Sequence, residues 1–64
     1  MIAVKHKELG DGYAICFCEK EGKTFIVVDF GEEKRDFVYP DSFSDILEAK
    51  DPEIQKQILE EIDK

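Results

Sequence analysis

Long hydrophobic segments are absent from this chain of 64 residues. The apolar stretch at residues 1–4 ends at Lys5, and this is too short for a membrane span or for the apolar part of a signal peptide. We therefore expect a cytoplasmic protein with no membrane association.

Cysteine and histidine are scarce, which limits metal and nucleophilic chemistry. Cys16 and Cys18 are the two cysteines and His6 is the single histidine. A disulfide between Cys16 and Cys18 would close a very small, strained ring, so we predict reduced thiols buried in the core. A zinc site or a thiol–imidazole pair is disfavoured, and the sequence predicts no metal, no cofactor and no catalytic residue.

Positive charge is also in short supply. The chain has nine basic and sixteen acidic residues, which gives a net charge of −7. Such a chain repels a phosphate backbone, so direct nucleic-acid binding is disfavoured. The basic residues that such binding would use are Lys5, Lys7, Lys20, Lys23, Lys34 and Arg35.

The length predicts one domain, residues 1–64, with a small hydrophobic core and no room for a deep catalytic cleft. We expect residues 1–40 to form a strongly bent antiparallel sheet. Residues 13–18, 24–30 and 35–39 are rich in aromatic and β-branched residues, and residues 2–6 predict a further strand at an edge. Both faces of the first hairpin are largely apolar, so the sheet must curl or be covered on its second side.

Helical spacing begins after Pro40, and residues 41–64 predict two helical segments. Phe43, Ile46 and Leu47 indicate the first. The second follows a capping Asp51 and Pro52, and its stripe of Ile54, Ile58 and Ile62 would pack on the sheet or form a homodimer through this C-terminal helix.

Gly10-Asp11-Gly12 superficially resembles a phosphate-binding loop. A strand follows these glycines, whereas phosphate loops open a helix and carry a Lys-Ser or Lys-Thr pair. We interpret them as the glycines of a tight turn between strands, anchored by a hydrogen-bonded His6.

Three pieces of the sequence resemble the small SH3/Tudor-like barrel modules found alone or appended to larger bacterial proteins. They are His6-x-x-Leu9-Gly10-x-Gly12, then Ile26-x-Val28-x-Phe30, then Lys34-x-x-x-Val38-Tyr39-Pro40-x-x-Phe43. The resemblance covers residues 1 to about 47 and extends to the tail of UvrD/PcrA-type helicases and the polymerase-binding domain of CarD-type factors. It implies a mainly β (α+β) fold, an SH3-like antiparallel barrel of four to five strands with a C-terminal helical extension.

The same resemblance implies a non-catalytic module that docks on a larger bacterial enzyme of transcription, repair or defence, such as RNA polymerase, a helicase or a nuclease. Candidate anchors for the partner are Tyr13, Phe37 and Tyr39, and the strand at 34–39 could instead pair with a strand of the partner. The alternative is a small acidic phage-type inhibitor that mimics nucleic-acid phosphates. Its acidic face would comprise Asp41, Asp45, Glu48, Glu53, Glu60 and Glu61.

Overall fold

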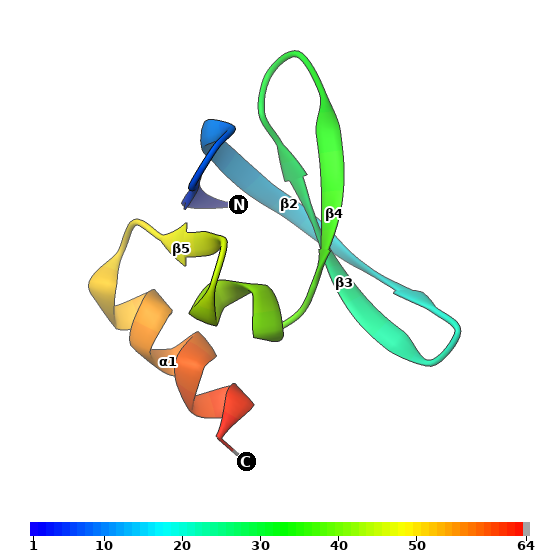
Figure 1. The fold of residues 1–64 in the computed structure, drawn as a ribbon, viewed down its shortest axis with the longest axis vertical. Helices are drawn as coiled ribbons and strands as arrows, with labels where there is room; N and C mark the ends of the chain where they lie inside the picture. Colours follow the sequence, from blue (N-terminus) through cyan, green and yellow to red (C-terminus); the bar gives the residue numbers. More distant parts are fainter. Residues whose placement is uncertain (64) are drawn as a thin grey trace.

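The chain folds into one curled sheet with a helix packed against one end. The structure is a computed structural model, and it describes residues 1–63. In chain order the elements are β1 (Ile2–His6), β2 (Gly10–Lys20), β3 (Lys23–Asp29), β4 (Lys34–Val38), the 3-10 helix η1 (Asp41–Ser44), β5 (Leu47–Ala49) and α1 (Pro52–Ile62). The sheet order is β4-β3-β2-β1-β5, and its paired strands are all antiparallel (Figure 1). This confirms the predicted SH3-like α+β fold class.

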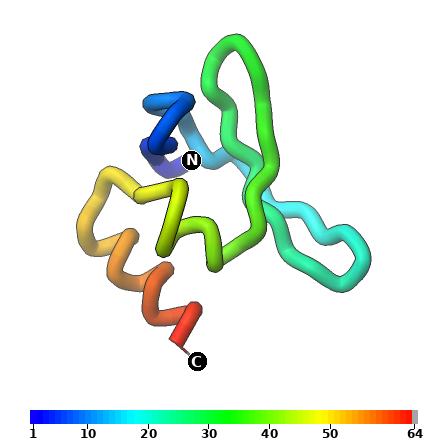
Figure 2. Tube along the Cα trace, in the orientation of Figure 1, coloured from blue at the N-terminus to red at the C-terminus, as the bar shows by residue number. Residues whose placement is uncertain are grey.

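The first strand lies inside the sheet, so its predicted edge position is wrong. Val4 pairs with Gly12 of β2 on one side and with Ala49 of β5 on the other. Figure 2 shows the β5 segment beside the start of the chain. The edges are β4 and β5, which do not pair with each other, so the sheet is a half-barrel.

A β-bulge interrupts β2 and exchanges its two faces. Ala14 pairs with Val28 and Cys16 with Val27, so Ile15 has no opposite residue. Because paired residues share a face, Ala14 lies on the inner face with Val28, whereas Cys16 lies on the outer face with Val27. A simple alternation along residues 13–18 would put Ala14, Cys16 and Cys18 on one face, and it fails beyond Ala14.

The core lies between the inner face of the sheet and the C-terminal elements. Its buried side chains come from the four strands β1, β2, β3 and β5, from η1 and from α1: Val4, Ala14, Ile26, Val28, Phe43, Leu47, Ala49 and Ile58. Phe43 is 2% exposed and closes this core. Half-buried Ile54 packs against it, so the helical stripe serves the core.

The C-terminal part contains one α-helix, because the first predicted helical segment ends after the single turn of η1. Leu47 and Ala49 are buried while Glu48 is exposed, and these residues pair with β1. Pairing with the free edge of β1 thus places the side chains of Leu47 and Ala49 on the buried face of the sheet. The second helix is confirmed: the Asp51 carboxylate accepts a hydrogen bond from the Glu53 N–H at 2.9 Å, and Pro52 occupies the first turn.

The predicted turn before β2 and a second turn after it join the first three strands. His6 Nδ1 accepts the backbone N–H groups of Glu8 and Leu9, each at 3.0 Å, which confirms its role as a turn anchor. Gly10 has φ +82, and Glu21 and Gly22 have φ 51 and 79 in the two-residue turn after β2. The φ values of Glu21 and Gly22 are both positive, as in a type I′ hairpin turn.

Gly12 is a strand residue, so our assignment of it to the turn is wrong. Its backbone lies close to β3 and to the ring of Phe30, the residue that follows β3. A Cβ there would come within 2.8 Å of Phe30 Cδ1 and 2.9 Å of the Asp29 carbonyl oxygen. Because Gly12 has no side chain, β2 can pack closely against β3 at this point.

Substituting Gly12→Ala should lower the free energy of unfolding by about 1–3 kcal/mol, because the backbone of β3 must shift to admit the methyl group. Urea denaturation measures the loss. Gly22→Asn is the matched control, since nothing lies within 4 Å of its Cβ and asparagine tolerates positive φ, so it should cost about 0.5 kcal/mol or less. Equal losses in the two variants would contradict the close approach.

Candidate interaction surface

An apolar patch occupies the outer face of β2, β3 and β4. We call it the outer patch, and its members are Tyr13, Cys16, Cys18, Phe25, Val27 and Val38. Cys18 pairs with Phe25, which pairs with Val38, and Cys16 pairs with Val27 in the neighbouring row. Tyr13 is 56% exposed and Val38 38%, and no part of residues 1–63 packs over the patch as a further layer.

Both cysteines belong to the outer patch, so their predicted burial in the core is wrong. Cys16 is exposed and Cys18 is half-buried, and both are free thiols. The bulge at Ile15 is the cause, because it turns the side chains that follow it to the other face. His6 is buried on the inner face, so the sheet separates its imidazole from both thiols.

An ion pair crosses the outer patch. Lys20 Nζ donates to the Asp36 carboxylate and lies 5.5 Å from the centre of the Phe25 ring. The hydrogen bond between the two side chains raises the pKa of Lys20 and lowers the pKa of Asp36. The lysine stem thus covers part of Phe25, while Val27 and Val38 keep apolar surface next to it.

The open edge of β4 borders the patch. The Tyr39 N–H donates to the Thr24 carbonyl at 2.9 Å, so the alternation of an antiparallel ladder turns the backbone groups of Lys34, Asp36 and Val38 away from β3. Two ion pairs lie near this edge, Lys20 with Asp36 and Arg35 with Glu33. Charges on a short edge strand disfavour indiscriminate strand addition.

The three predicted anchor residues do not lie together. Tyr13 is on the outer face, whereas Phe37 packs on the inner side with its ring centre 5.3 Å from that of His6. Tyr39 contacts Phe17 edge-to-face at 4.8 Å, and its hydroxyl donates to Glu61 Oε2 at 2.6 Å. Of the three, Tyr13 alone belongs to the outer patch.

The predicted acidic face does not form one helical array. Asp41, Asp45 and Glu48 are spaced as if on one face of a helix, but Asp41 lies in η1, Asp45 just after it and Glu48 on β5. Asp45 pairs with Lys7 at 3.8 Å, and Glu48 is opposite Lys5 across the strands. Glu53, Glu60 and Glu61 do lie on α1, where Glu61 accepts the Tyr39 hydroxyl.

Residues 1–63 contain no group of three or more His, Cys, Asp or Glu side chains that could hold a metal ion. Over the same residues, no helix is long and apolar enough to cross a membrane. No protein-family model, curated protein or solved structure matches this chain. The function is therefore inferred from the geometry of the outer patch.

Tyr39 should titrate far above an ordinary tyrosine. Partial burial and the Glu61 carboxylate raise its pKa from 10.0 to about 12, because both disfavour the phenolate. In a Tyr13→Phe variant Tyr39 is the remaining tyrosine, so the tyrosinate absorbance of the folded protein should rise with a midpoint near 12. Adding Glu61→Gln should lower that midpoint toward 10, and a midpoint near 10 before this change would contradict the contact.

The sign of the coupling to stability follows from the raised pKa. The fold stabilises the neutral phenol, so this contribution is complete below about pH 10 and is lost as the pH rises toward 12. Tyr39→Phe should therefore lose less stability than the wild type over this interval in urea denaturation.

Proposed function

We propose that this protein is a non-catalytic protein-interaction module whose outer patch docks on an apolar surface of a larger bacterial enzyme. The observation that carries the proposal is the sequence of β3, where Phe25, Ile26, Val27 and Val28 are consecutive apolar residues. Such a run is typical of a strand that is buried on both faces. Residues 1–63 cover one face, and a partner would cover the other.

The composition of the outer patch supports a protein partner. Phe25, Val27, Val38 and the two thiols give it apolar surface, and the Lys20–Asp36 pair that crosses it over the Phe25 ring supplies charged groups. Protein interfaces likewise combine apolar and aromatic contacts with a smaller number of polar ones. By the resemblance to SH3/Tudor-like modules, we place the partner among cytoplasmic enzymes of transcription, repair or defence.

The wild type and two double variants test this function by capture from a bacterial lysate. Val27→Thr with Val38→Thr keeps β-branched side chains and removes outward apolar surface. A partner should be retained by the wild type at both about 50 mM and about 500 mM salt and lost by this double variant, because apolar contacts are weakly screened. Glu60→Lys with Glu61→Lys, which leaves the patch intact, should retain it.

Purified bacterial RNA polymerase and a UvrD-type helicase then serve as defined ligands in a titration of the labelled chain. Binding that the Val27→Thr, Val38→Thr variant weakens by about tenfold or more supports the proposal. Binding that is instead abolished by salt and by Glu60→Lys with Glu61→Lys, and retained by the threonine variant, would establish phosphate mimicry. No partner for the wild type in either experiment would contradict an interaction module.

A further inference from the structure

The two thiols of the outer patch form a pair on one face of β2. Cys16 is opposite Val27 and Cys18 is opposite Phe25, and the register is regular between these two rows. Residues two apart in a strand point to the same side, so both thiols lie on the outer face. Cys16 is exposed, Cys18 is half-buried, and neither is in a disulfide. Free cysteine is among the most buried residue types, so packing alone does not account for this pair.

The spacing of the pair suits a bridging ion better than a disulfide. Two residues of an extended strand rise by about 6.6 Å, and side chains on one face start about that far apart. A disulfide needs Cβ atoms about 3.5–4.5 Å apart. A metal ion held in line between two thiolates spans about 4.6 Å from sulfur to sulfur, at about 2.3 Å for each bond. Side chains that lean toward each other from Cys16 and Cys18 match this wider span.

The pair has no third ligand beside it within residues 1–63. His6 is buried on the inner face, across the sheet from both thiols. On the outer face Val27 separates Asp36 from Cys16, and the Asp36 carboxylate is bonded to Lys20. Structural zinc takes four ligands and iron–sulfur clusters are held by four cysteines, so two thiols suit neither.

We propose that Cys16 and Cys18 bind one Cu(I) ion as a two-coordinate dithiolate. Thiolates select soft ions, and Cu(I) is the soft ion that accepts two thiolates in line. Each thiol releases its proton to solvent and no electron is transferred, so the bound ion and its two thiolates carry one negative charge. The site goes beyond the proposed docking function and does not depend on it.

The side chains around the pair favour such a complex. Phe25 and Val27, opposite the two cysteines, give the ion an apolar border. Lys20 follows Cys18 on the same face of β2. The pKa of Lys20 is raised first by the hydrogen bond to Asp36 and its charge, and to a smaller extent by the Cys18 thiolate. The ammonium group is thus close enough to the sulfur to stabilise negative charge there.

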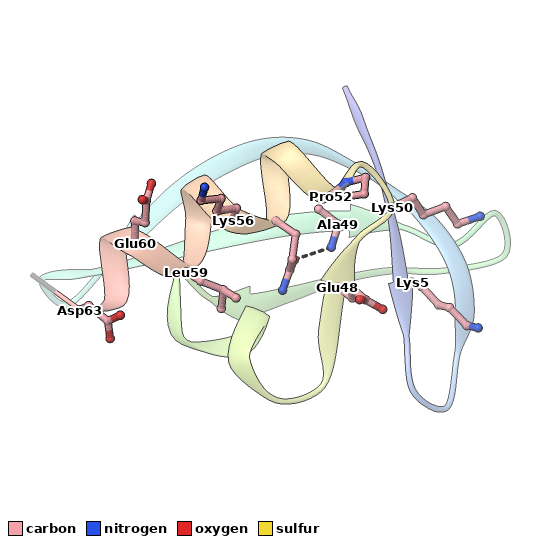
Figure 3. A pocket seen from close by; sticks show the side chains of 10 residues that line it. Lys5, Glu48, Ala49, Lys50, Pro52, Lys56, Leu59, Glu60 and Asp63 are labelled. Carbon is pink, nitrogen blue, oxygen red and sulfur yellow. Dashed lines mark hydrogen bonds between the residues drawn. The ribbon is translucent and has the colours of Figure 1, made fainter.

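The largest groove of residues 1–63 offers harder donors. It has a volume of about 700 Å³ between α1 and β5, and three lysines and three carboxylates line it (Figure 3). Its charges are interleaved: Glu48 is opposite Lys5, and Lys50 pairs with Asp11 at 3.1 Å. No sulfur lines the groove, and carboxylates suit magnesium or calcium. Cu(I) should therefore select the thiols.

Titration of the reduced chain with Cu(I) tests the site. The titration is done without oxygen and in competition with bicinchoninate, a Cu(I) chelator whose colour reports the copper that the protein does not hold. The wild type should take up one equivalent. Native mass spectrometry should show the 7.4 kDa monomer with one copper ion. The affinity should rise with pH, because binding releases protons.

Cys16→Ser and Cys18→Ser should each weaken Cu(I) binding by about a hundredfold or more, since loss of a mere hydrogen-bond partner of a ligand costs about 10–100-fold. Cys16→Ser with Glu19→Cys is the matched control for cysteine number. It keeps two thiols and changes an exposed residue, but residues 18 and 19 point to opposite faces, so it should bind as weakly as the single variants. Circular dichroism shows whether each variant is folded.

Three results would overturn the inference. The first is no uptake of Cu(I) by the wild type. The second is undiminished affinity in Cys16→Ser with Cys18→Ser, where Met1 and His6 remain as donors, or in the control with Glu19→Cys. The third is a complex of two chains with one copper ion, in which each chain supplies one thiolate.

The outer-patch variant Val27→Thr, Val38→Thr separates this inference from the proposed function. It keeps both thiols and should bind Cu(I) as the wild type does, while it loses the docking partner. Failure of Cu(I) binding in the wild type leaves the docking experiments unaffected, so the two proposals fail separately.

Discussion

One small hydrophobic core has to stabilise the whole molecule, and it covers one face of the sheet. The helix α1, the turn η1 and the strand β5 pack on the inner face, where Val4, Val28 and Phe43 are 2% exposed or less. Residues 1–63 provide no second layer for the other face, as is usual for so small a core. The apolar side chains of the outer patch therefore have no further layer of these residues packed over them.

The bulge at Ile15 decides which residues of β2 point to the outer face of the sheet. Composition predicted strands at 13–18 and 24–30 and an apolar character for both of their faces. It did not predict which side chains point outward, because alternation along a strand assumes an unbroken register. One extra residue moved Cys16 and Cys18 out of the predicted core and brought Phe17 to the inner face, next to Tyr39.

Sequence motifs predicted the structure reliably where the interactions join residues close together in the chain. Asp51 and Pro52 specify the start of α1, and His6 anchors the turn that follows it, since these hydrogen bonds span two or three residues. Residues 45–49 depend on a distant partner, the free edge of β1. Their spacing of apolar residues fits a helix turn as well as a three-residue strand, so pattern alone could not distinguish them. For the same reason the two hydrogen bonds by which Gln55 joins α1 to Ala49 and Phe43 had no signal in the sequence.

The accessibility of the two thiols tests the central claim most directly. The rate at which a thiol reagent modifies each cysteine is measured in the folded protein and in the urea-unfolded chain. Comparing the two rates shows which face of β2 carries each cysteine. The account predicts that Cys16 in a Cys18→Ser variant reacts without unfolding and nearly as fast as in the unfolded chain, because its side chain is exposed. Protection of Cys16 until global unfolding would place it in the core and contradict the bulge, the outer patch and the function built on them.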